Sequence, residues 1–298
     1  MAKRVLIMSG GGAKGAYQAG VIEQLNRLEW DPDAVAGISV GALNGVMVAT
    51  GQSDKLIEIW QGLREEQVLK KRRIDHQAKN YLLHKIGVKK ATLGFFDNSP
   101  LKEKLKKSVG RQFTKHYYCG TVNIETGAYK EHVARPMMVP WNYLDAVIAS
   151  TAIPVVFDPV NLDGELHVDG GVRHMNPIGK ILQDHNPDEI IFITTRKFDE
   201  PNEVKKVDDV VDVAVQTLHI LLEEIFIKDL REFIRINELV RQANDQGFEL
   251  KKSNGEPFKV YKAKLYQPQK PLGDSLNFSN DQANRNINIG LESEPNEL

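Results

Sequence analysis

A serine between two glycines is the first candidate for chemistry in this sequence. The stretch GISVG at 37–41 has the pattern G-x-S-x-G, where a strand-like run is followed by a helix-like one. A serine on such a strand-to-helix turn is held out at the end of a sheet, near the positive end of the helix. The pattern predicts Ser39 as a nucleophile, with Gly37 and Gly41 permitting the sharp bend. The alternative is a turn of small residues that serves packing alone.

Three glycines near the N-terminus could supply donors for a developing negative charge. Gly10, Gly11 and Gly12 lie between an apolar run and a predicted helix that begins at Gly15. A nucleophilic serine needs an oxyanion hole, in which preorganised N–H groups stabilise the charge on the carbonyl oxygen. Successive glycines at a helix start offer such N–H groups and leave room for a substrate carbonyl. We therefore expect this stretch to bind a transient oxyanion.

The same stretch also satisfies G-x-G-x-x-G, the dinucleotide pattern. That interpretation requires an acidic residue at the C-terminal end of the second strand, whereas Asp31 and Asp33 precede it. A phosphate-binding loop would need lysine at position 16, which is alanine. A nucleotide-binding oxidoreductase is thus disfavoured. A titration with nucleotide cofactors would decide between nucleotide binding and oxyanion binding.

The serine proton needs an acceptor, and the segment HVDGGVRHMNP at 167–177 holds the candidates. Asp169 is followed by two glycines, which would allow a close approach to the serine turn. His167 and His174 lie nearby, so the spacing alone leaves a Ser-His-Asp triad open.

Hydrophobic periodicity predicts the elements that must position these residues. Strands are expected at 4–8, 34–39, 189–195 and 258–268, with a strand–turn–strand unit at 117–134. Helices are expected at 15–28, after Ser39, and at 207–243 as one long amphipathic helix or a helical pair. This alternation predicts an α/β fold, a three-layer α/β/α sandwich with a mostly parallel central sheet.

The C-terminal part carries a helix signal and an acidic tail. Ser279 and Gln282 have the spacing of a capping box for a last helix. We expect the acidic tail after Gly290 to be frayed.

Composition excludes several classes of protein. The chain has 298 residues, a formal net charge of −1 and one cysteine, Cys119, which excludes an intramolecular disulfide and a Cys-based metal cluster. The N-terminal apolar run is too short for a secretory signal, and no apolar run approaches the roughly 18 residues of a membrane span. We expect a cytoplasmic protein whose membrane contacts, where they occur, are peripheral.

The segment 64–115 is strongly basic, with fifteen Lys or Arg against five Asp or Glu, an excess of +10. One interpretation is a solvated helical insertion. The other is a surface that lies on anionic lipid, where each basic residue contributes about 1 kcal/mol. Nucleic acid is not expected as a partner, because Tyr81, Phe95 and Phe96 form no recognisable stacking platform.

Four blocks together resemble the patatin-like phospholipase family, in the order in which that family carries them. They are GGGAKG at 10–15, GISVG at 37–41, ASTAIP at 149–154 and DGG at 169–171, the last followed by MNP. The ending SLNFSNDQANRNINIGLE also resembles the family's C-terminal helix. The resemblance implies one catalytic domain over 1–298, with core motifs at 5–180. The basic insertion or cap at 64–115 and a C-terminal part of helix and strand at 200–298 belong to the same domain.

The resemblance implies a Ser-Asp dyad without histidine, in which Ser39 is the nucleophile and Asp169 the general base. The implied oxyanion and substrate-binding residues are Gly10, Gly11, Gly12, Lys14 and Gly15. Lys14 stands where the family often has arginine. Gly170 and Gly171 complete the aspartate block.

The implied reaction is hydrolysis of an acyl lipid through an acyl-enzyme, by a phospholipase A or a lysophospholipase. The implied partner is a phospholipid or another acyl lipid, and no metal or cofactor is implied. Two alternatives stay open: a non-lipid serine esterase or thioesterase, and a catalytically silent scaffold that binds acyl groups or membranes. The sequence does not indicate the oligomeric state.

Overall fold

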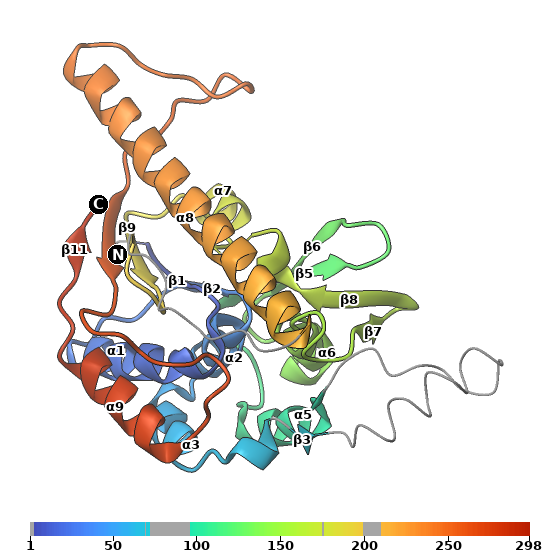
Figure 1. Ribbon diagram of the computed structural model, residues 1–298. Helices are drawn as coiled ribbons and strands as arrows, with labels where there is room; N and C mark the ends of the chain where they lie inside the picture. The colour runs from blue at the N-terminus through green and yellow to red at the C-terminus, as the bar shows by residue number, and fades with distance from the viewer. Residues whose placement is uncertain (1–2, 69, 72–95, 175, 199–209) are drawn as a thin grey trace.

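A mixed β-sheet forms the centre of the molecule (Figure 1). The computed structural model describes residues 3–68, 70–71, 96–174, 176–198 and 210–298. Within them the sheet has nine strands in the order β11-β10-β9-β1-β2-β5-β8-β7, and β6 pairs with β5. The strands are β1 Arg4–Met8, β2 Ala34–Gly37, β5 His116–Asn123, β6 Tyr129–Ala134, β7 Val160–Leu162, β8 Glu165–Asp169, β9 Glu189–Ile193, β10 Lys262–Tyr266 and β11 Asn296–Glu297. β3 Lys70–Lys71 and β4 Phe96–Asp97 form a separate pair.

The parallel centre of the sheet brings the chemical motifs to one edge. β10, β9, β1, β2 and β5 are parallel to one another. Met8, the last residue of β1, pairs with Gly37 of β2 and with Ile193 of β9. The segments that follow these three strands therefore leave the sheet side by side. β8 runs antiparallel to β5 and also ends there, with Asp169 opposite Thr121.

Helices cover both faces of the sheet (Figure 1). They are α1 Gly15–Arg27, α2 Val40–Ala49, α3 Leu56–Gln61, α5 Ser99–Ser108, α6 Leu144–Ser150, α7 Gly179–His185, α8 Val210–Asp245 and α9 Asn280–Leu291. Side chains of β1 alternate between the faces: Leu6 and Met8 join the core under α1 and α2, while Val5 and Ile7 join the core under α7 and α8. The predicted three-layer α/β/α architecture is confirmed.

Most predicted elements are present, with shorter bounds. The strand expected at 34–39 ends at Gly37, because the chain turns there toward Ser39. The periodic segment 207–243 is one helix, α8, rather than a helical pair, although residues 207–209 lie outside the described residues. Of the helices in the described ranges, none has both the length and the apolar character that crossing a membrane requires.

Two expectations for the C-terminus were wrong. Ser279 caps α9, but the side chain of Gln282 donates to the carbonyls of Asp274 and Asn277 instead of closing a capping box. The tail is not frayed, because β11 pairs with β10 and the Leu298 amide donates to the carbonyl of Ala263 at 2.9 Å.

The basic segment is described only in part, since its residues 69 and 72–95 lie outside the described ranges. Two lysines of α5 have acidic partners: Lys102 pairs with Asp145 of α6, and Lys106 pairs with Glu103. Phe96 of β4 packs against Phe157. Its ring is half-buried, with its centroid 6.2 Å from that of Phe157.

Candidate active site

Ser39 occupies a strained turn between β2 and α2. Its backbone has φ 55° and ψ −126°, a conformation that residues other than glycine rarely adopt. The two motif glycines are needed for space. A Cβ on Gly37 would overlap the carbonyl of Gly41, and a Cβ on Gly41 would overlap the carbonyl of Met8. The turn thus holds Ser39 at the edge where the parallel strands end.

Asp169 lies within hydrogen-bond reach of this serine. Its carboxylate accepts from the Gly171 amide at 2.8 Å, and the Ser39 hydroxyl is near enough to lower the pKa of the carboxyl group. The side chain is only 2% exposed. Burial raises the pKa of Asp169 to about 7, against the lowering effects of the Gly171 amide and the Ser39 hydroxyl. A carboxylate with this pKa is suited to accept and return a proton near neutral pH.

The block ASTAIP at 149–154 ties the two residues together. The Ser39 amide donates to Ser150 Oγ at 3.1 Å, and the Asp169 amide donates to the carbonyl of Ala152 at 3.0 Å. Gly170 allows β8 to approach, since a Cβ there would overlap the carbonyl of Gly120.

The two nearby histidines have other partners. His167 is buried, with Nδ1 2.8 Å from Thr121 Oγ1 and Nε2 3.2 Å from Glu165. His174 Nδ1 lies 3.7 Å from the carboxylate of Asp229. Among the described residues no hydrogen bond joins either imidazole to Ser39. The geometry therefore favours Asp169 over a histidine as the partner of Ser39.

The glycine stretch that follows β1 presents backbone donors beside Ser39. Gly11 and Gly12 have φ values of 146° and 58°. The next amides are satisfied: Ala13 donates to the carbonyl of Ser275, and Lys14 donates to that of Gly11. In the described part of the chain, the amides of Gly10, Gly11 and Gly12 donate no hydrogen bond to a protein acceptor. Such amides are available to a ligand oxygen that carries negative charge.

Buried side chains that the sequence analysis missed hold this glycine stretch in place. Thr195, just beyond β9, donates through Oγ1 to the carbonyl of Gly10 at 2.5 Å, and its amide donates to Ser9 Oγ at 3.2 Å. Gln18 on α1 donates to the carbonyl of Ser9 at 2.8 Å. These bonds fix the peptide groups that precede the free amides.

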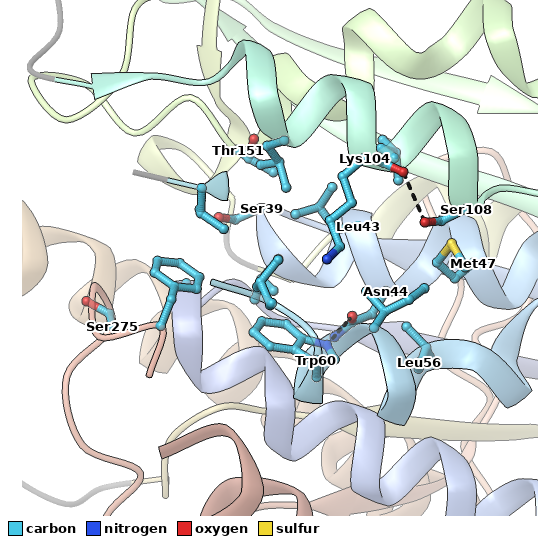
Figure 2. A pocket seen from close by; sticks show the side chains of 18 of the residues that line it. Ser39, Leu43, Asn44, Met47, Leu56, Trp60, Lys104, Ser108, Thr151 and Ser275 are labelled. Carbon is cyan, nitrogen blue, oxygen red and sulfur yellow. Dashed lines mark hydrogen bonds between the residues drawn. The ribbon is translucent and has the colours of Figure 1, made fainter. Parts of the chain in front are cut away.

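The same network continues into α2 and α3. Asn44 donates to Gln18 Oε1 at 2.9 Å, and Trp60 donates to Asn44 Oδ1 at 3.1 Å (Figure 2). Gln18 and Asn44 are polar side chains on otherwise apolar faces of α1 and α2. An amide in such a position is the sequence feature that could have indicated this buried network.

Two cavities meet at Ser39. The first, the α5 cavity, holds about 810 Å³ of empty space, part of it open to solvent, and lies between α2, α3 and α5 (Figure 2). Its lining is mostly apolar and includes Leu43, Met47, Leu56, Ile59, Trp60, Leu63, Leu101, Leu105, Phe157 and Phe278. The second, the α8 cavity, has a volume of about 660 Å³. Its lining includes Gly10, Gly11, Lys14, Asp169, Thr195, Arg196, Leu222 and Phe226.

Of the residues predicted to act in catalysis, oxyanion binding or substrate binding, all but Gly15 line the α8 cavity. Gly15 lines neither cavity and instead begins α1, where a Cβ would overlap Val40. The acids that a dinucleotide site would need lie at the other edge of the sheet. Asp33 accepts from the Arg4 amide at 2.8 Å, and Asp31 pairs with Lys115. In the described ranges no cluster of His, Cys, Asp or Glu could hold a metal ion.

A comparison with protein families agrees with the resemblance found in the sequence motifs. A family model described as patatin-like phospholipase matches residues 6–182, which contain all four sequence blocks. Two curated proteins named Lysophospholipase nte1 are similar, at 25% identity for Aspergillus terreus (strain NIH 2624 / FGSC A1156) and 24% for Aspergillus oryzae (strain ATCC 42149 / RIB 40). Each alignment covers 58% of this chain but 11% of the relative, so the chain spans only a small part of those proteins.

Among solved structures, the crystal structure of VipD from Legionella pneumophila is similar, with a TM-score of 0.48 at 16% identity. The alignment covers 98% of this chain and 65% of that one.

Proposed function

Because this chain belongs to the patatin-like phospholipase family, we propose that it is a serine hydrolase of acyl lipids, acting as a phospholipase A or a lysophospholipase. The observation that carries the proposal is the placement of Ser39 beside the buried carboxylate of Asp169, where an apolar cavity meets the amides of Gly10, Gly11 and Gly12. The names of the curated relatives, both lysophospholipases, support the same class of substrate.

The arrangement supports a two-step mechanism. Ser39 Oγ attacks the acyl carbonyl carbon while Asp169 accepts its proton, and the amides of Gly10, Gly11 and Gly12 stabilise the resulting oxyanion. The oxyanion collapses, the bond to the alcohol breaks, and Asp169 returns the proton to that alcohol. Water then attacks the acyl-enzyme with Asp169 again as base, which releases the fatty acid and restores Ser39.

The α5 cavity favours a lipid substrate over a small polar ester. It begins at Ser39 and is lined along α2 by Val40, Leu43 and Met47. Burial of an acyl chain there contributes about 0.8 kcal/mol for each CH₂ group removed from water. A short soluble ester would leave most of this surface unused.

Release of fatty acid from defined lipids tests the proposal. We expect the protein to release fatty acid from a lysophospholipid or a diacyl phospholipid in mixed micelles, faster than it hydrolyses a short p-nitrophenyl ester or an acyl thioester. Hydrolysis of the short ester or thioester alone would establish a non-lipid esterase or a thioesterase. No hydrolysis of any ester would establish a silent acyl-binding scaffold.

The pH dependence of turnover follows from Asp169. Since burial raises its pKa to about 7 and only the ionised carboxylate accepts a proton, kcat/KM for a soluble ester should fall about tenfold per pH unit below that value. Above it, kcat/KM should level off. A profile measured from pH 5 to 9 provides the check. A flat profile, or activity that rises toward acid pH, would exclude Asp169 as the base.

The basic segment 64–115 is proposed to bind anionic membranes. Binding to vesicles rich in anionic lipid should weaken with salt, because exposed charges are screened over about 8 Å at physiological ionic strength. Replacing Lys70, Lys71, Arg72 and Arg73 together by glutamate should reduce vesicle binding and lipid hydrolysis but not hydrolysis of a soluble ester. Equal loss on both substrates would indicate misfolding, and unchanged vesicle binding would establish a solvated insertion.

A further inference from the structure

Among the described residues, Lys104 is the one charged side chain that lines the mostly apolar α5 cavity. Leu101, Lys104, Leu105 and Ser108 of α5 face the cavity, at the i, i+3, i+4, i+7 spacing of one helix face. Figure 2 shows Lys104 on α5 across the cavity from Leu43 and Asn44 of α2. The cavity runs along α2 from Val40 to Met47, a distance of about 10 Å at 1.5 Å per residue. A ligand that extends from Ser39 into this cavity would therefore lie beside the positive charge of Lys104.

The ammonium group of Lys104 has no anionic partner among the described residues. Its Nζ donates to Gln67 Oε1 at 3.2 Å, and that oxygen already accepts from the Arg64 amide. Nearby lysines of α5 differ: Lys102 pairs with Asp145, and Lys106 pairs with Glu103. Burial lowers the pKa of Lys104, because partial removal from water disfavours the charged ammonium group. The amide oxygen of Gln67 carries no negative charge that would offset this effect.

A cation in such surroundings is complementary to an anion that arrives with the ligand. Partly buried charges are stabilised by a counter-charge, and hydrogen bonds between two ionised groups are about twice as strong as neutral ones. The group that enters an apolar cavity from Ser39 is the acyl chain. A carboxylate on that chain, away from the ester, would meet Lys104 inside the cavity.

We propose that Lys104 forms an anion subsite in the α5 cavity, which selects acyl groups that carry a carboxylate at their far end. The inference rests on the proposed hydrolysis of acyl esters and names a substrate class for it: esters of dicarboxylic half-acids, including oxidised lipid chains. The reacting bond and the roles of Ser39 and Asp169 are unchanged.

Binding to a protein that cannot turn over tests the subsite directly. In Ser39→Ala protein, monomethyl suberate should bind about tenfold or more tightly than methyl octanoate, as one charge-assisted hydrogen bond would give. Adding Lys104→Met, which keeps the length of the side chain without its charge, should remove this preference. Lys104→Arg should retain it, and Lys107→Met, an exposed change on the same helix, should leave it intact. Titration calorimetry measures all four proteins.

Equal affinity for the two esters, or a preference that survives Lys104→Met, would overturn the subsite. A phosphate of the lipid head-group is the other possible anion, so hydrolysis of a lysophospholipid is compared with that of a monoacylglycerol with the same saturated chain. A fall in this ratio in Lys104→Met, without loss of the suberate preference, would overturn the acyl subsite and assign Lys104 to the head-group. Because suberate binding needs no turnover, it is decided separately from the proposed function.

Discussion

Replacing Ser39 by alanine is expected to lower kcat for acyl-ester hydrolysis by about 10⁴-fold or more, the scale on which loss of a serine nucleophile acts. The hydroxyl oxygen is the only atom of this residue that can form the acyl bond, and alanine removes it without filling the cavity. Fatty acid release from a lysophospholipid and hydrolysis of a soluble ester should fall together. Both are measured at substrate concentrations that separate kcat from KM.

A surface serine provides the control for this change. Ser53 lies in the 3₁₀ turn Ser53–Lys55, where its hydroxyl is 3.3 Å from Asn26. Ser53→Ala should retain full activity, and both variants should unfold at the temperature of the unmodified protein. Activity of Ser39→Ala within tenfold of the unmodified protein would mean that another residue attacks the ester.

Asp169→Asn is expected to reduce kcat by about 10²- to 10⁴-fold, the usual contribution of a general base. The asparagine carbonyl oxygen can still accept from the Gly171 amide, so the turn is retained, but an amide does not take the serine proton. His167→Ala and His174→Ala should cost far less. If His174→Ala were as damaging as Asp169→Asn, a histidine-containing triad would have to replace the Ser-Asp pair.

The same variant should be more stable than the unmodified protein at alkaline pH. A folded-state pKa of about 7 against an ordinary value of 3.8 means that Asp169 favours the folded state while protonated. This contribution is complete below pH 3.8 and lost as the pH rises through 7. Removing the ionised carboxylate at pH 8 should therefore raise the free energy of unfolding, by up to about 4 kcal/mol for a shift of this size. Lower activity with higher stability separates a catalytic role from a structural one.

The motifs could be placed from the sequence because each lies on a short turn between the end of a strand and the start of a helix. β1 and β2 are continuous apolar runs, as expected for strands buried on both faces, and each is followed at once by glycines and a helix. Once the two strands are parallel neighbours, the glycine stretch and Ser39 must leave the sheet at the same edge. Asp169 could be placed there only through the resemblance, since periodicity does not say which strand lies beside which.

Features that depend on long-range contacts could not be predicted in this way. The Ser39 amide bonds to Ser150, 111 positions away, and Thr195 bonds to Gly10, 185 positions away. Fraying of the C-terminal tail was expected because its residues are few and acidic. The tail is instead ordered as β11, because β10 offers an open sheet edge with which it pairs. The α5 cavity is lined by residues of three separate helices, and no one of their sequences specifies that space.

Covalent labelling is the most direct test of Ser39 as the nucleophile. A fluorophosphonate reacts with a serine that has both an activating base and donors for the oxyanion, because its phosphonyl group mimics the tetrahedral intermediate. We expect one adduct, located by peptide mass spectrometry on the peptide that contains Ser39, and no adduct in Ser39→Ala. An adduct on another residue, or undiminished labelling of Ser39→Ala, would contradict Ser39 as the nucleophile.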